Sequence, residues 1–172
     1  MRAINKVFLC LLLLMALGHE IAAKEWRSII PLHSTRDDVT RLLGQPDKAN
    51  DGSARYILEK EEVLVLYASP DSIDCLKHLP VGTVLLIQIT PKRELLIADL
   101  QIDKKRFRKL NPSDYPNGEY EGYINKIEGI MIRTIKGRVD TIIYMAGKDE
   151  HPCPAYLGYS KYFINVFPGL SP

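Results

Sequence analysis

Two short motifs in the sequence could bind a metal or form a covalent link, because each combines a cysteine with a histidine. Cys75 precedes His78 by three positions, and His151 precedes Cys153 by two. Cys-x-x-His spacing suits a tetrahedral zinc site, whereas His-x-Cys is tight for two ligands of one ion. The cysteines could instead pair directly. That bridge would close a loop of 78 residue steps, which the chain-entropy model values at about 4–5 kcal/mol.

The carboxylates near Cys75 are the other candidates for chemistry. Asp71 and Asp74 could line a cleft together with His78, which would suit an extracytoplasmic hydrolase. His33 and Ser34 are adjacent, but Ser34 is better explained as a helix cap than as a nucleophile. No set of residues combines a nucleophile with a base and an orienting acid. We therefore assign no catalytic, cofactor-binding or metal-binding residue and expect no cofactor.

Residues 1–23 have the layout of a secretory signal peptide. Arg2 and Lys6 precede the apolar run 7–17, and residues 21–23 offer a small residue for cleavage before Lys24. Those eleven apolar residues would rise about 16 Å as a helix, which is short of a hydrocarbon core of roughly 30 Å. We expect a secreted or periplasmic protein with no membrane span after cleavage. Export favours the disulfide, and the metal site remains its alternative.

Charge and composition exclude several classes of protein. The whole chain has a formal net charge of +2, and removal of Arg2, Lys6 and Glu20 with the leader leaves +1. A nearly neutral chain has no electrostatic preference for nucleic acid, so we expect no nucleic-acid partner. A hydrophobic content of 46% with 26% charged residues also excludes a disordered chain.

A short helix is predicted to follow the extended entry at residues 29–33. Ser34 with Asp37 could form a capping box at its start, and Thr35 with Asp38 is the alternative one position on. Apolar residues fall on one face at positions i, i+3 and i+4, namely Val39, Leu42 and Leu43. The helix is expected to end at two signals, Gly44 and Pro46.

Most of the remaining pattern is typical of strands. Segments with strand-like alternation or β-branched content are residues 54–58, 63–69, 83–90, 95–100, 119–123, 129–134 and 138–145. A second short helix is predicted over residues 103–110, with Phe107 and Leu110 inward. Residues 24–172 should form a single α+β domain: an antiparallel sheet of about six strands with two short helices packed on one face. Part of the aromatic tail beyond Pro152 should dock on this body.

Two resemblances add to this interpretation. Residues 26–46 (WRSIIPLHSTRDDVTRLLGQP), 80–84 (PVGTV), 128–130 (EGI) and 138–139 (RV) resemble a group of uncharacterised secreted bacterial proteins. Residues 34–67 are remotely similar to the helix-then-hairpin unit of the SmpA/OmlA small outer-membrane lipoproteins and of β-lactamase-inhibitor proteins. That resemblance implies a short helix, ending Leu-Leu-Gly-x-Pro, packed on an antiparallel sheet. The chain lacks the lipoproteins' lipidation cysteine at the cleavage site, and no functional residue transfers.

The expected function is therefore that of an exported, non-enzymatic binding or interaction module. Its partner would be a protein in the envelope or outside the cell, bound by the sheet's open face or by the aromatic tail. The hydrolase that uses Asp71, Asp74 or His78 is the alternative.

Overall fold

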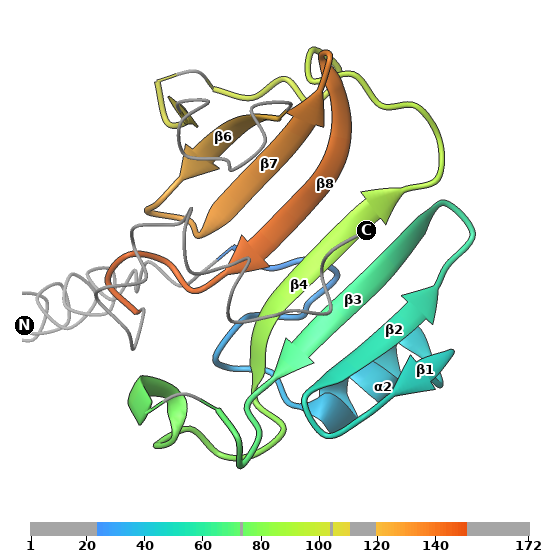
Figure 1. Cartoon of the computed structure of the whole chain (residues 1–172), viewed down its shortest axis with the longest axis vertical. Coiled ribbons are helices and arrows are strands. Elements are labelled where there is room, and N and C mark those ends of the chain that lie inside the picture. The colour runs from blue at the N-terminus through green and yellow to red at the C-terminus, as the bar shows by residue number, and fades with distance from the viewer. Residues whose placement is uncertain (1–23, 73, 104, 111–119, 151–172) are drawn as a thin grey trace, which may run out of the picture.

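The computed structural model describes residues 24–72, 74–103, 105–110 and 120–150. These residues form an antiparallel eight-stranded sheet with the order β1-β2-β3-β4-β8-β7-β6-β5 (Figure 1). The strands are β1 (Lys48–Ala49), β2 (Ser53–Ile57), β3 (Glu61–Tyr67), β4 (Val84–Pro91), β5 (Arg108–Leu110), β6 (Glu121–Asn125), β7 (Ile130–Ile135) and β8 (Arg138–Met145). The helical elements described are α2 (Arg36–Leu43) and the 3-10 turn η1 (Asp74–Leu76).

The sheet is built from two meanders of four strands that meet in its centre. Consecutive strands pair from β1 to β4 and from β5 to β8, and the halves join where β4 pairs with β8. The register of this joint runs from Leu86 opposite Met145 to Ile89 opposite Ile142. The β7–β8 hairpin turns at Lys136 and Gly137, whose φ angles are 50° and 78°. Two positive φ values are what a tight turn matching the strand twist requires, and glycine is favoured at such a position.

The predicted sheet of about six strands with two helices on one face is wrong. The described chain is mostly a single eight-stranded sheet with one α-helix, close to an all-β fold. The strands that the sequence did not predict are the edge strands β1 and β5, which have two and three residues. Elements that short show no alternation, and only their pairing with a neighbouring strand defines them.

The predicted helix over residues 103–110 does not form. Residues 105 and 106 form a turn instead, and the amide groups of Arg106 and Phe107 donate to the carbonyl oxygen of Asp103 at 2.9 and 3.0 Å. The chain then enters β5. A helix would place Lys105 and Lys109 on one face, where like charges repel. In the turn and strand, Arg106 pairs with Glu128 and Lys109 with Glu121.

The predicted strand over residues 95–100 is also absent. Only an isolated bridge links Leu96 to Arg138. Alternate residues of this stretch, Leu95 and Ile97, are half-buried against the sheet. The apolar pattern that suggested a strand therefore reflects packing of a connecting segment over a sheet face.

The helix α2 forms as predicted, with its cap at the alternative position. Thr35 is the N-cap, and it shares a reciprocal capping box with Asp38. The Ser34 hydroxyl instead accepts a hydrogen bond from the Ile30 amide at 2.9 Å. The amide of Gly44, at a φ of 85°, closes the helix by donating to the carbonyl of Thr40. Val39 is buried, whereas Leu42, predicted to be on the apolar face, is exposed.

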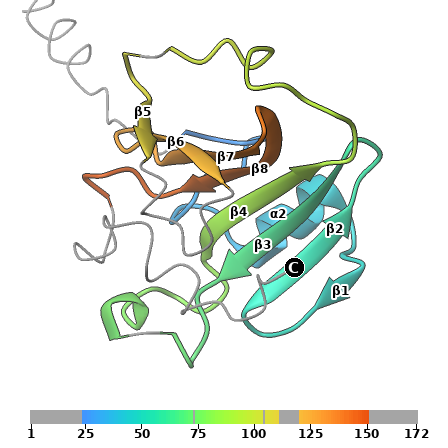
Figure 2. The same ribbon diagram turned by 45° about the horizontal axis from the view of Figure 1, so that its top comes forward.

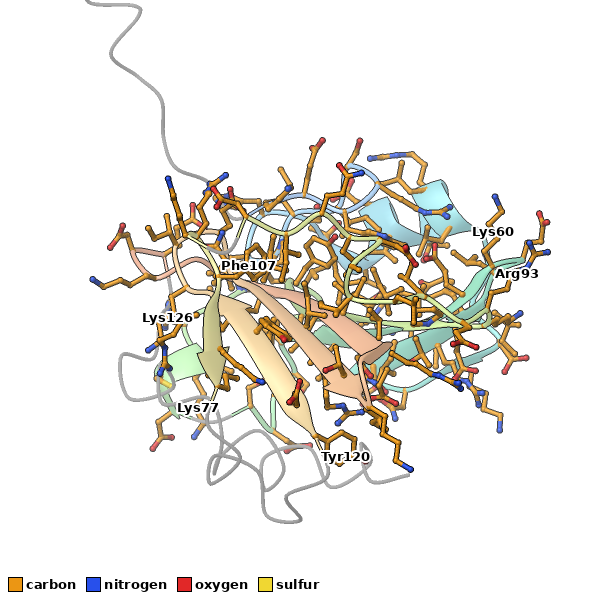
Figure 3. All side chains as sticks on the ribbon, turned by 90° about the horizontal axis from the view of Figure 1, so that it is seen from above. Lys60, Lys77, Arg93, Phe107, Tyr120 and Lys126 are labelled. Carbon is orange, nitrogen blue, oxygen red and sulfur yellow. The ribbon has the colours of Figure 1, made fainter. Side chains whose placement is uncertain are left out.

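The two faces of the sheet are covered differently. On the first face, α2 and residues 26–31 pack over β2, β3 and β4. Apolar side chains of the connection after β4 pack over β7 and β8, namely Leu95, Ile97, Leu100, Ile102 and Phe107. The face turned toward the viewer in Figure 1 is the second face, and α2 lies behind it. Turning the molecule shows α2 behind β2, β3 and β4 (Figure 2). In the edge-on view, α2 and Phe107 lie on one side of the sheet and Tyr120 lies on the other (Figure 3).

Within the described residues, no helix is long and apolar enough to cross a membrane. Residues 1–23 lie outside the described residues, so the signal peptide stays a prediction. The aromatic tail beyond Pro152 also lies outside them.

Candidate functional site

The second face carries an apolar cluster that reaches across the sheet. Its buried members come from β3, β4, β5, β6, β7 and β8, and they are Leu66, Leu86, Leu110, Ile124, Met131, Ile143 and Met145. Each is 2–6% exposed. The half-buried residues packed against them, Leu64 and Leu85, also lie in strands. Among the described residues, the apolar side chains of this cluster and those packed against it therefore all come from strands, unlike those of the first face.

One row of cross-strand partners shows how the second face changes from charged to apolar and back. Residues directly opposite in register share a face. The row runs from β2 to β5 through Arg55, Leu64, Gln88, Ile143, Met131, Ile124 and Arg108. The row therefore has an arginine at each end and mainly apolar side chains between them, and Gln88 is its one side-chain amide. An apolar centre inside a polar rim is the typical anatomy of a protein interface.

Over β7 and β8, an arginine forms one side of that rim. Arg133 Nε donates to Asp140 Oδ2 at 2.7 Å, and its Nη2 lies 3.1 Å from Thr141 Oγ1. Its guanidinium carbon also lies 4.8 Å from the ring centre of Tyr120. The Arg133 side chain is 32% exposed, so the guanidinium is held in place by these partners but remains accessible. Arginine and tyrosine are both enriched at protein interfaces.

The opposite side of the rim lies over β2 and β3. Arg55 Nε lies 2.6 Å from Glu62 Oε1, and this hydrogen bond holds the pKa of the Glu62 carboxyl below its usual range. Ile57 faces the same side as Arg55 and is 52% exposed. This part of the second face is therefore open, with one large apolar side chain beside a charged pair.

An open cavity of about 480 Å³ adjoins the Arg133 group at the β7–β8 hairpin. Its lining is Ile135, Lys136, Arg138, Val139 and Asp140. Asp140 accepts from Arg133 and from the Thr141 hydroxyl, and Arg138 pairs with Glu94 at 3.0 Å. The one carboxylate of the lining is therefore engaged, and the lining holds no serine, cysteine or histidine to act as a nucleophile or base. The cavity fits contact with a partner better than catalysis.

The residues proposed for a hydrolase lie on the surface of the loop between β3 and β4. Asp71 and His78 are exposed. The Asp74 side chain is 95% exposed and lies 2.7 Å from Lys77 Nζ, an ion pair that lowers the pKa of this carboxyl. A general acid would need a raised pKa and a sheltered position, so these contacts do not favour that role. Among the described residues, no three metal-ligating side chains converge.

Cys75 lies in η1, half-buried at the same loop. Its predicted disulfide partner Cys153, and His151 of the alternative metal site, lie outside the described residues. The Cys75–Cys153 bridge and the metal site with His78 and His151 therefore stay predictions. Counting thiols in the denatured chain, together with metal analysis, would distinguish them.

The first face also contains ionisable groups, but these are tyrosines that pack in the hydrophobic core. Tyr56 and Tyr67 are almost fully buried between α2 and the sheet. Burial raises the pKa of the Tyr67 hydroxyl, with the Tyr56 hydroxyl beside it as the next cause. The Arg36 guanidinium lies 4.2 Å from the Tyr67 ring centre. Burial also raises the pKa of Tyr144. The raised pKa values keep the Tyr67 and Tyr144 hydroxyls neutral near pH 7, so these two groups are not activated nucleophiles.

Sequence reasoning missed the group formed by Arg133, Asp140, Thr141 and Tyr120. One signal was available, because Met131 and Arg133 alternate with Ile132 along β7 and must lie on the face opposite to it. The cross-strand partners of Arg133 could not be predicted, since Tyr120 lies just outside a strand and a bulge shifts the register between β7 and β8.

Comparison with known proteins leaves the fold and these residues as the basis for any functional conclusion. No protein-family model matches the chain, and neither the curated proteins nor the solved structures contain a significant match. The resemblance of residues 34–67 to the SmpA/OmlA helix-and-hairpin unit thus stays a prediction.

Proposed function

We propose that the protein is an exported, non-enzymatic binding module whose second sheet face contacts a protein partner. One observation carries the proposal: an apolar cluster spans that face from β3 to β5, and charged and aromatic side chains border it. The cluster itself is buried, so the accessible part of this face is its border, where Arg133, Tyr120 and the exposed Ile57 lie. Side chains of these types suit a protein partner rather than a small polar substrate.

The chemistry of the described residues supports binding over turnover. The carboxylates beside the second face, Glu62 and Asp140, are each bound by an arginine. A carboxylate whose oxygen is paired with a guanidinium is not free to act as a general base. The same groups can orient a partner, because charged rim residues set its register and orientation.

A pull-down with matched variants tests this proposal. The exported chain is immobilised and exposed to an envelope fraction, beside the variants Ile57→Asp and Leu42→Asp. Both side chains are large, apolar and exposed, but Ile57 lies on the second face and Leu42 on α2. We expect Ile57→Asp to reduce capture of a defined protein at least tenfold, while Leu42→Asp retains it.

Two results would contradict the proposal. Equal capture by both variants would show that the interface does not lie on the second face. Turnover of a generic ester, glycoside or peptide by the purified chain would show an enzyme instead.

A further inference from the structure

The cavity at the β7–β8 hairpin opens on the second face of the sheet. Met131, Arg133 and Ile135 alternate along β7 and share a face, and Met131 belongs to the second-face cluster. Arg138 lies opposite Ile135 in register, so it faces the same side. The cavity therefore lies beyond the Arg133 group, at the end of the sheet where β7 passes into β8 (Figure 1).

We propose that this cavity binds the carboxylate of an aspartate or glutamate side chain of the protein partner, through Lys136 and Arg138. The contact belongs to the second face, so its biological role rests on the proposed function. The affinity of the cavity for a carboxylate can be measured with no partner present.

The charges around the cavity leave one cation without a counter-ion. Asp140 lies 2.6 Å from Arg133, and Arg138 lies 3.0 Å from Glu94. The Lys136 side chain is exposed and forms no ion pair with a described residue. Three cations therefore face two carboxylates, which leaves one positive charge. A single carboxylate neutralises that charge, whereas a phosphate dianion would exceed it and would be repelled by Asp140.

Arg138 can bind a second carboxylate at little cost. Its side chain is 65% exposed, and that of its partner Glu94 is 55% exposed. Exposed ion pairs of this kind contribute little to stability, and a guanidinium has five N–H donors to share. Asp140 does not compete for these donors, because Arg133 and the Thr141 hydroxyl already donate to it.

The rest of the lining suits the aliphatic part of an acidic side chain. Ile135 is half-buried and Val139 is 7% exposed. Sites with apolar walls and a few placed polar groups are typical for organic ligands, and a volume of about 480 Å³ is within their usual range. The cavity is therefore a better complement to an acidic side chain than to an inorganic ion.

The backbone at Lys136 is a second indication of a binding role. Its φ angle is 50°, in the left-handed region that disfavours most residues with a Cβ atom. Asparagine, aspartate and glycine are the usual residues at this position of a tight turn. A lysine here weakens the turn relative to asparagine, and residues held in such conformations gather at functional sites.

A β-bulge next to the turn places Asp140 at the cavity. In register, Arg133 lies opposite Thr141 and Thr134 lies opposite Val139, so Asp140 is the extra residue of β8. Bulges re-aim side chains and are common beside functional sites. Here the Asp140 carboxylate meets Arg133, which leaves the two cations of the lining for a partner.

Titration with a short peptide measures the site directly. The probe is acetyl-Leu-Glu-Leu-amide, and its neutral counterpart has glutamine in place of glutamate. NMR follows the backbone amide resonances of residues 135–140 in the exported chain. We expect the acidic peptide to shift these resonances saturably and to bind at least tenfold more tightly than the glutamine peptide, with a difference that shrinks as salt is added.

The variant Lys136→Asn separates binding from folding, because its two effects have opposite signs. Asparagine tolerates the left-handed region, so the variant should resist urea at least as well as the native chain. It also removes the unpaired cation, so we expect the affinity for the acidic peptide to fall at least fivefold. The matched control is Lys148→Asn, an exposed lysine beyond the opposite end of β8, which should leave that affinity unchanged.

Four results would overturn the proposal. They are equal affinity for the two peptides, shifts confined to resonances outside residues 135–140, unchanged affinity in Lys136→Asn, and tighter binding of inorganic phosphate than of the acidic peptide. The last result would indicate a phosphate site instead.

The two proposals fail in different ways. Binding of the acidic peptide at the hairpin with no captured partner would reject the proposed function and leave the carboxylate site intact. A captured partner with no peptide binding at the hairpin would reject the carboxylate site alone.

Discussion

The two faces of the sheet use the same strands but differ in what lies against them. Ile87 and Leu86 are neighbours on β4, and they belong to the buried clusters of opposite faces. Ile87 packs in a cluster that includes residues from α2 and the N-terminal segment, whereas Leu86 belongs to a cluster whose described apolar members all come from strands. Apolar alternation along a strand therefore specifies two buried faces without specifying what packs against each one.

The largest expected effect tests whether both faces are packed equally well. We expect Ile87→Ala to lower the free energy of unfolding by about 3–4 kcal/mol, because a rigid surround leaves a cavity. Leu86→Ala should cost about 2 kcal/mol, at the lower end of the range for such truncations, since no helix among the described residues packs over its cluster. Urea denaturation of both variants gives the two values, and equal losses would remove the contrast.

A smaller effect concerns the cover of the first face alone. Thr35→Ala removes the N-cap of α2 and should lower stability by about 1 kcal/mol. Asp37→Asn, an exposed change in the same turn, is the control and should have little effect. Urea denaturation followed by Trp26 fluorescence measures the loss. Oxidation of Met131 and Met145 should not change in Thr35→Ala, and faster oxidation would show that the faces are not independent.

The smallest effect is a pH dependence that separates two kinds of stabilised carboxylate. Hydrogen bonds from Thr35 lower the pKa of Asp38, and the hydrogen bond from Arg55 lowers that of Glu62. A folded-state pKa below the unfolded value gives stability that is present above the unfolded pKa and is lost as pH falls through the folded pKa. The unfolded values lie near pH 4, so the loss should occur below that pH.

Salt distinguishes the two carboxylates. Asp38→Asn and Glu62→Gln should each lower stability at pH 7 and flatten its fall in acid, as measured by urea denaturation at several pH values. Added salt should weaken the Glu62 contribution, which comes from an exposed ion pair, more than the Asp38 contribution, whose largest cause is a backbone hydrogen bond. Equal salt sensitivity would contradict this assignment.

Local signals predicted α2 and the longer strands, because caps, turn residues and alternation act over a few positions. Thr35, Gly44 and the Lys136-Gly137 turn illustrate this. The predictions at residues 95–100 and 103–110 were wrong because an apolar or amphipathic pattern there reflects packing and pairing with distant segments. The same limit hid the candidate site, since Arg133 meets Asp140 and Tyr120 only after β6, β7 and β8 have paired.

Local preferences set which residues turn, which begin a helix and which alternate between two faces, because these preferences arise from each residue and its near neighbours. Tertiary structure alone decided that β4 joins β8, because that pairing brings together residues more than fifty positions apart. It also decided that one face lies under α2 while the other presents an apolar centre with a charged rim. Burial of apolar area favours any close fit, and the shape of the assembled sheet selects which one forms.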